Sequence, residues 1–169
     1  MRQMSNWAFI GIDPGQSGAI AIVSSNQKIL LLEDWPGDEV QAAKIVRGAI
    51  VWAEGLQIRA AIEKVSAMPK QGVSSTFKFG CNFGIWKGIL ASFEIPFLEV
   101  RPQAWMKGVV SKKQDGKASS IAAAGRMFPA AELLGPRGGK KDGRADALLI
   151  ANWCRLQFIG EKPIERKRR

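Results

Sequence analysis

The chain has 169 residues, of which 46% are hydrophobic and 24% charged, values typical of one globular domain and not of a disordered, fibrous or coiled-coil protein. It contains no histidine, which excludes a Ser-His-Asp triad, a Cys-His pair and nearly every zinc enzyme. Charged residues interrupt its apolar runs and its start does not resemble a signal peptide, so we expect a soluble cytoplasmic protein, with an organelle as the alternative.

The net charge of +10 is concentrated in one part of the chain. Positions 101–144 hold ten lysines and arginines against three acids, positions 161–169 hold five bases against two acids, and elsewhere the charges cancel. Such a basic block is typical of a protein that binds a polyanion, because bound phosphates release counterions. A solvated surface is the alternative, favoured only for 166–169. We expect one domain over 1–160 and a flexible basic tail over 161–169.

The order of apolar segments predicts a mixed α/β fold. Three short apolar runs separated by turn residues favour an antiparallel meander over 7–12, 19–23 and 28–32. A helical period over 38–54 follows, with Asp38 as its cap. Strands and helices then alternate, with strands at 58–62 and 96–100 and helices at 74–93, 117–127 and 142–158. This order predicts a five-stranded mixed sheet with helices on both faces.

Four acidic residues occupy positions where burial is expected. Asp13 and Glu63 each end an apolar strand. If the first and fourth strands are parallel neighbours, both carboxylates emerge at one edge of the sheet, where α/β proteins bind ligands. Asp142 and Asp146 are four residues apart on one face of the last helix, and Asp146 also continues an apolar stripe. We therefore expect Asp146 to face the sheet.

These acids have structural alternatives. Asp13 lies in an Asp-Pro-Gly turn, where it can accept a local backbone hydrogen bond, and Asp142 is equally well explained as a helix N-cap. Clustered carboxylates repel one another unless a cation neutralises them, and hard oxygen ligands select Mg²⁺ or Mn²⁺. Two such ions about 4 Å apart activate a water and stabilise the leaving oxygen in phosphoryl displacement. A basic protein without histidine can use this mechanism.

Three segments of the chain resemble a known nuclease family. In order, Phe-Ile-Gly-Ile-Asp-Pro-Gly at 9–15, Ile-Glu-Lys-Val at 62–65 and Arg-Ala-Asp-Ala-Leu-Leu-Ile-Ala at 144–151 are similar to the opening motif, second acidic strand and closing helix of the RuvC family of Holliday-junction resolvases. The resemblance extends to Gln157 and implies an RNase H-like fold, ordered βββαβαβα plus a C-terminal helix.

The resemblance also implies an activity. The family's members are homodimeric, Mg²⁺-dependent endonucleases that bind four-way DNA junctions and cut two opposing strands, leaving 5′-phosphates and 3′-hydroxyls. By position, Asp13, Glu63 and Asp146 would be ligands for two Mg²⁺ ions per active site, with Mn²⁺ as a substitute. Many cellular members have a fourth acid three residues before the last, which here is Gly143. Asp142 would serve instead, as in the phage and organellar branches. We expect no membrane partner and no small-molecule cofactor.

Residues for DNA binding are implied by the same resemblance. Family lysines following the fifth strand contact phosphates near the scissile bond, and Lys117 is our preferred catalytic lysine. The basic candidates are Lys107, Lys112, Lys113 and Lys117, together with Lys140, Lys141 and Arg144 of the basic block, with solvated lysines as the alternative, chiefly at Lys112 and Lys113. Met68 or Phe77 would enter the junction centre, although a core position is the favoured explanation for Phe77.

Three glycines mark one face of the helix predicted at 74–93. Gly80, Gly84 and Gly88 recur every fourth residue, and each costs about 1 kcal/mol against alanine in a helix. Close backbone approach is the expected compensation, either to the chain's own sheet or to a second subunit, and the resemblance favours a dimer interface. The two cysteines, Cys81 and Cys154, are expected to be buried small hydrophobes.

The leading hypothesis is a structure-selective endonuclease acting on four-way junctions. One alternative is an RNase H-like nuclease acting on other branched or hybrid substrates, and another is a non-catalytic junction-binding protein. A third is an ATP-binding domain, because Asp13 to Gly18 also resembles the first phosphate loop of the sugar kinase and actin fold. That fold needs two lobes.

Overall fold

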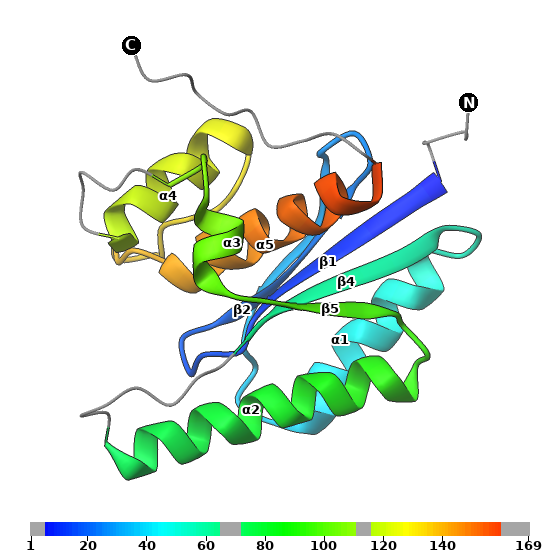
Figure 1. Ribbon diagram of the computed structural model, residues 1–169, viewed down its shortest axis with the longest axis horizontal. Coiled ribbons are helices and arrows are strands. Elements are labelled where there is room, and N and C mark those ends of the chain that lie inside the picture. Colours follow the sequence, from blue (N-terminus) through cyan, green and yellow to red (C-terminus); the bar gives the residue numbers. More distant parts are fainter. Residues whose placement is uncertain (1–5, 65–71, 111–115, 160–169) are drawn as a thin grey trace.

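The computed structural model describes residues 6–64, 72–110 and 116–159, in which one five-stranded sheet lies between two layers of helices (Figure 1). The strands are β1 (Trp7–Asp13), β2 (Ala19–Ser24), β3 (Ile29–Asp34), β4 (Gln57–Glu63) and β5 (Phe97–Val100). The helices are α1 (Glu39–Trp52), α2 (Val73–Ser92), α3 (Pro102–Met106), α4 (Gly116–Met127) and α5 (Asp142–Ile159). The predicted tail lies outside the described residues.

The order of strands in the sheet is β3-β2-β1-β4-β5. The first three strands pair antiparallel, which confirms the predicted meander, and β4 pairs parallel with β1 and β5. Since Ile12 pairs with Ile62, Asp13 and Glu63 both follow at the same edge of the sheet. Ala19 pairs with both Asp13 and Asp34, so the end of β3 lies at this edge too.

Alternate residues along the strands supply two cores, one on each face of the sheet. On one face, α1 and α2 cover Ile10, Ile12 and Ile62, with Trp86 of α2 fully buried among them. On the other face, α3, α4 and α5 cover Phe9 and its neighbours (Figure 1). The side chain of Asp38 accepts a hydrogen bond from the Gln41 amide, as the predicted cap of α1 requires.

Helix α5 packs directly on β1 because a glycine faces it. A Cβ atom at Gly11 would lie 2.2 Å from the carbonyl oxygen of Ala147 and 2.2 Å from the amide nitrogen of Ala151, distances that no side chain can occupy. The helix and strand backbones are therefore in contact, as their fully buried surroundings confirm. This contact sets where the N-terminal turns of α5 lie over the sheet edge.

Two short elements are missing from the sequence predictions, and the prediction for one cysteine is wrong. The short helix α3 and a hairpin over 133–141, bridged between Leu134 and Lys140, had no periodic signal because both are short. Cys81 is exposed on α2, so its predicted burial is wrong. Cys154 is buried as predicted, and burial raises the pKa of its thiol to about 12.

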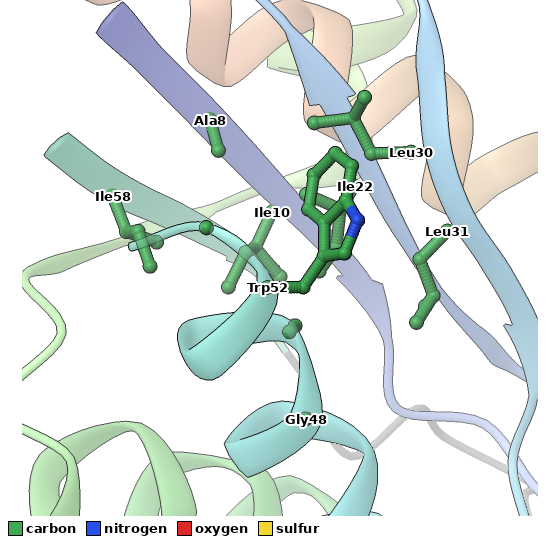
Figure 2. A pocket seen from close by; sticks show the side chains of 10 residues that line it. Ala8, Ile10, Ile22, Leu30, Leu31, Gly48, Trp52 and Ile58 are labelled. Carbon is green, nitrogen blue, oxygen red and sulfur yellow. The ribbon is translucent and has the colours of Figure 1, made fainter. Parts of the chain in front are cut away.

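An apolar cavity of about 250 Å³ separates the end of α1 from the sheet. Figure 2 shows Trp52 and Gly48 on α1 and Ile10, Ile22 and Ile58 on the strands, all lining this cavity. None of its lining residues is titratable, so this cavity offers no chemistry. In the part of the chain that the structure describes, no helix has the length and hydropathy needed to cross a membrane. The described residues form one sheet, whereas the ATP-binding alternative requires two lobes.

Candidate functional site

Three carboxylates from distant parts of the sequence form one electrostatic cluster at the sheet edge. Burial, followed by the charge of Asp13, raises the pKa of Glu63 to about 7. Burial is also the largest cause that raises the pKa of Asp146 to about 7, and the charges of Asp13, Glu63 and Asp142 add to it. The predicted convergence of the ends of β1 and β4 with α5 is therefore present.

The turn after β1 fixes Asp13. Its Oδ1 accepts a hydrogen bond from the amide of Gly15 at 2.9 Å, and the amide of Gly18 donates to the carbonyl of Gly15 at 3.0 Å. The local turn bond expected from Asp-Pro-Gly is thus formed. A Cβ atom at Gly18 would lie 2.1 Å from the carbonyl oxygen of Asp13, so this turn closes only with glycine there.

Trp105, which the sequence analysis did not single out, holds Glu63. The indole Nε1–H donates to Oε2 of Glu63 at 2.8 Å, and the Trp105 side chain is only 2% exposed. Helix α3 begins directly after β5, the neighbour of β4, and so brings the indole to this edge. The one signal in the sequence that could have identified this residue is the presence of a tryptophan in a short polar segment that follows a strand.

Asp146 is the most constrained of the carboxylates. The Ser120 side chain on α4 hydrogen-bonds to it, and its Oδ1 atom is buried with no hydrogen-bond partner among the described residues. An unsatisfied buried carboxylate oxygen is costly, and native proteins rarely keep one without a role. The predicted orientation of Asp146 toward the sheet is consistent with this burial.

Steric crowding explains why the fourth acid is not at position 143. A Cβ atom at Gly143 would lie 2.0 Å from the carbonyl oxygen of Ser17, because α5 begins against the β1–β2 turn. No acidic side chain fits there. The Lys141 carbonyl accepts the Ala145 amide at 3.2 Å, which makes Lys141 the cap and Asp142 the first helical residue. The N-cap alternative for Asp142 is therefore wrong.

The donor set of the cluster fits a divalent cation. Carboxylate oxygens are the ligands that Mg²⁺ and Mn²⁺ prefer, and Asp146 supplies an oxygen without a partner within the described ranges. No described lysine or arginine forms an ion pair with Glu63 or Asp146. Across 6–64, 72–110 and 116–159, however, no three such side chains are already gathered as closely as a metal site requires. The metal-free arrangement is therefore a loose cluster.

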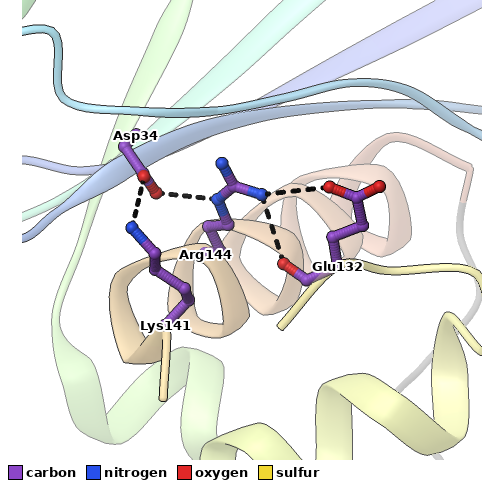
Figure 3. Close-up of polar contacts among 4 residues, drawn as sticks. All are labelled: Asp34, Glu132, Lys141 and Arg144. Carbon is purple, nitrogen blue, oxygen red and sulfur yellow. Dashed lines mark hydrogen bonds and ion pairs between the residues drawn. The ribbon is translucent and has the colours of Figure 1, made fainter. Parts of the chain in front are cut away.

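Two of the predicted DNA-binding residues are held by an acid. Figure 3 shows Asp34 between Lys141 and Arg144, with Oδ2 2.7 Å from Lys141 Nζ and Oδ1 2.7 Å from Arg144 Nε. Arg144 Nη1 also donates to the carbonyl of Glu132 at 3.2 Å. Burial tends to raise the pKa of Asp34, but Arg144 and Lys141 outweigh it and lower the pKa. These two side chains tie β3 to the start of α5.

The remaining candidates lie around this edge or outside the described residues. Lys107 ends α3, and Lys140 is exposed on the 133–141 hairpin. Lys117 is the second residue of α4, but its side chain and the whole of Met68, Lys112 and Lys113 lie outside what the structure describes. Phe77 is 71% exposed on α2, so its favoured interpretation as a core residue is wrong.

The three glycines of α2 do not pack on their own sheet. Gly80, Gly84 and Gly88 are exposed, and a Cβ atom added at any of them meets no described atom within 4 Å. The intrachain explanation for the glycine stripe is thus wrong. With Val73 at 87% exposure, Phe77 and Cys81, they form an apolar face along α2 that no described residue covers.

Comparison with known proteins places this geometry in a recognised fold. No protein-family model matches the chain, and no curated protein matches it. The structure is similar to Thermus thermophilus RuvC in complex with a Holliday junction substrate, with a TM-score of 0.65, 17% identity and coverage of 91% of this chain and 94% of that one. It is also similar to Thermus thermophilus RuvC determined separately, with a TM-score of 0.63, 16% identity and coverage of 90% and 96%. A third similar structure is the yeast mitochondrial Holliday junction resolvase Ydc2, with a TM-score of 0.54, 14% identity and coverage of 91% and 79%. The chain therefore has the fold of the RuvC resolvases.

The burial of Asp146 predicts a pH-dependent effect on stability. A carboxyl whose pKa rises from 3.8 to about 7 on folding favours the folded state when protonated, so its contribution is present below pH 3.8 and is lost as the pH rises through 7. In EDTA at pH 8, Asp146→Asn should therefore unfold several degrees above the wild type, a gain of about 1–3 kcal/mol. The gain should shrink toward pH 4.

Thermal unfolding followed by circular dichroism at both pH values measures this. Asp38→Asn is the matched control, because Asp38 is a partly exposed helix cap and asparagine caps equally well. It should show no pH-dependent gain. A wild type that is more stable than Asp146→Asn at pH 8 without metal would contradict the burial of an uncompensated charge.

Proposed function

We propose that the protein is a divalent-metal-dependent endonuclease that resolves four-way DNA junctions. The observation that carries this proposal is the gathering of Asp13, Glu63 and Asp146 at one sheet edge, where Glu63 and Asp146 are mostly buried and form no ion pair with a described lysine or arginine. The fold it shares with two RuvC structures, one of them bound to a Holliday junction, supports the choice of substrate. The reaction is phosphodiester hydrolysis that leaves 5′-phosphate and 3′-hydroxyl ends.

Asp13, Glu63 and Asp146 would hold the metal, with Asp142 at the margin of the cluster. When bound, two Mg²⁺ ions, or Mn²⁺ in their place, would activate the attacking water and stabilise the leaving oxygen. The chain's own contribution is orientation. The Gly15 amide, the Trp105 indole and the Ser120 side chain each hold one carboxylate in the metal-free cluster, which would have to draw closer together to enclose an ion.

Basic residues near this edge would bind the phosphates of the DNA. Lys107 follows Trp105 by two residues, and Lys117 is the second residue of α4, the helix that supplies Ser120. Both lie on the elements that surround the carboxylates. A lysine near the scissile phosphate lowers the cost of the charge that develops in the transition state, and Lys117 remains our candidate for this role.

A homodimer joined through α2 would explain the exposed apolar face. A four-way junction with two strands to cut requires two active sites, which a twofold dimer supplies. Glycine in the interior of a helix costs about 1 kcal/mol relative to alanine, and this cost has no intrachain compensation at Gly80, Gly84 or Gly88. Close contact with the same helix of a second copy provides one.

Cleavage assays test the proposed activity. With Mg²⁺, the wild type should introduce paired nicks into an immobile four-way junction and act more slowly on a linear duplex, a flap or an RNA–DNA hybrid. Asp13→Asn, Glu63→Gln and Asp146→Asn should each lower the rate at least about a thousandfold, because each removes a charge from the metal site, while junction binding persists.

The control for this experiment is Glu54→Gln, an exposed acid at the end of α1 that should leave cleavage unchanged. Preferred cleavage of the hybrid would point to an RNase H activity instead. Undiminished activity in EDTA would contradict metal dependence, and binding without any cleavage would support the non-catalytic alternative.

The Trp105–Glu63 hydrogen bond predicts an effect on metal affinity. Trp105→Phe keeps an aromatic ring in the core but removes the N–H that holds Glu63 Oε2. Loss of a group that orients a metal ligand typically weakens binding about 10- to 100-fold. Mn²⁺ titration followed by electron paramagnetic resonance should show this loss while the fold persists. Trp52→Phe, at the exposed end of α1, should bind Mn²⁺ like the wild type.

The proposed dimer interface predicts that two glycine substitutions affect dimerisation differently. Gly48→Ala on α1 and Gly84→Ala on α2 both have open space for a Cβ within the chain, so each should stabilise its helix by about 1 kcal/mol. Only Gly84→Ala should weaken the dimer, by about tenfold, because an added methyl overpacks a close interface. Sedimentation over a range of concentrations measures this, and equal dimerisation of the two variants would exclude the glycine face as the interface.

A further inference from the structure

A second concave site lies at the same sheet edge as the carboxylates, on the side of β2 and β3. It is a cleft of about 680 Å³ between the 133–141 hairpin and the β1–β2 turn at Gln16 to Gly18. Trp35 lines it, directly after β3, and Asp142 borders both this cleft and the carboxylate cluster. The cleft is thus adjacent to the candidate metal site and distinct from it.

The wall formed by the hairpin is hydrogen-bonded and anchored. The Gly135 amide donates to the Gly139 carbonyl at 2.7 Å, and the Lys141 amide donates to the Leu133 carbonyl at 2.9 Å. At its base, Lys141 and Arg144 are held by Asp34 at the end of β3, as Figure 3 shows. The exposed tip is therefore fixed relative to the sheet.

Two basic side chains of the cleft are not matched by an acidic side chain of the described chain. Asp34 is matched by Lys141 and Arg144, whereas Arg137 and Lys140 on the hairpin are exposed and form no ion pair within the described residues. Asp142 is the other acid of the lining. A phosphate group would be attracted to the two uncompensated side chains, and the N-terminus of α5 beside them adds to this attraction.

An aromatic surface completes the cleft. Trp35 is partly buried, its amide donates to the Gly18 carbonyl at 2.9 Å, and its ring meets the fully buried Trp86 at 5.3 Å between centroids with an interplanar angle of 64°. The ring packs on Trp86 at the margin of the core under α1 and α2, and Trp35 is one of the residues that line the cleft. Single-stranded nucleic acids bind to such pairings of an aromatic ring with cations.

We infer that this cleft binds one nucleotide of the DNA strand that is cut, with its phosphate on Arg137 and Lys140 and its base against Trp35. The inference rests on the proposed nuclease function. β3 is two strands away from β1, about 10 Å at the usual strand spacing. With about 3.4 Å of rise per nucleotide along a strand, the bound nucleotide lies about three positions from the scissile phosphate.

Photocrosslinking tests the position of the base. A four-way junction carrying 5-iodouracil at successive positions of one strand is bound to Asp146→Asn in EDTA, irradiated and mapped by mass spectrometry. A crosslink to Trp35 is expected from a position about three nucleotides from the cut. Crosslinks confined to other residues at every position would overturn the inference.

Binding measurements test the two cations in the otherwise unchanged protein. The double variant Arg137→Ala with Lys140→Ala should bind the junction at least about tenfold more weakly. The slope of the logarithm of its binding constant against the logarithm of the salt concentration should become shallower by about two. The matched control is Lys44→Ala with Arg47→Ala, which removes two exposed charges from α1 on the other face of the sheet. The Mn²⁺ affinity of both double variants should equal that of the wild type.

The outcomes separate this inference from the proposed function. If the wild type cuts junctions but both double variants bind equally well, the cleft is not a DNA site and the inference fails alone. If the wild type neither binds nor cuts junctions, the proposed function and the inference fail together. Weaker binding by the hairpin variant alone, together with the Trp35 crosslink, supports the site.

Discussion

The backbone contact between α5 and β1 is the constraint on which the candidate site depends. Only glycine at position 11 lets the helix lie this close to the strand, since a Cβ atom would meet Ala147 and Ala151 of the helix at 2.2 Å. The same crowding recurs where Gly143 meets the β1–β2 turn. Two glycine contacts thus fix the position of α5 along the sheet, and with it the height of Asp146 above the ends of β1 and β4.

Placing carboxylates at such a closely packed edge has an electrostatic cost. Burial and mutual repulsion raise the pKa of Glu63 and of Asp146 to about 7, so their ionised forms destabilise the metal-free fold near neutral pH. The hydrogen bonds from Trp105 and Ser120 offset part of this cost and also fix the carboxylates. Sites whose residues bind a ligand at the expense of folding stability are common in proteins that act on other molecules.

The basic residues of this edge divide into two kinds according to their partners. Lys141 and Arg144 bind Asp34 and thereby join the last helix to β3, so their charges are already matched. Arg137 and Lys140 extend from the same hairpin without such a partner in the described chain. Residues that are adjacent in a basic segment therefore differ in role, one pair supporting the fold and the other remaining available to a phosphate.

Much of the fold follows from local patterns in the sequence. The alternation of apolar residues in the strands, the helical period of α1 and the cap at Asp38 depend on neighbours within a few positions, so the order of the elements was predictable except for the short helix α3. The ends of β1 and β4 identified Asp13 and Glu63 because a polar residue closing an apolar strand is a local signal.

Only the tertiary structure decided which distant side chains are partners. The hydrogen bond from Trp105 to Glu63 joins residues 42 positions apart, and the ion pairs of Asp34 reach across more than 100 positions, so no periodicity encodes them. The same holds for Phe77 and the α2 glycines, whose exposure depends on how the helix is rotated against the sheet. The sequence by itself determined the elements and their charges, because these are local. The contacts that orient each charge required the assembled fold, since packing alone sets the distances between elements.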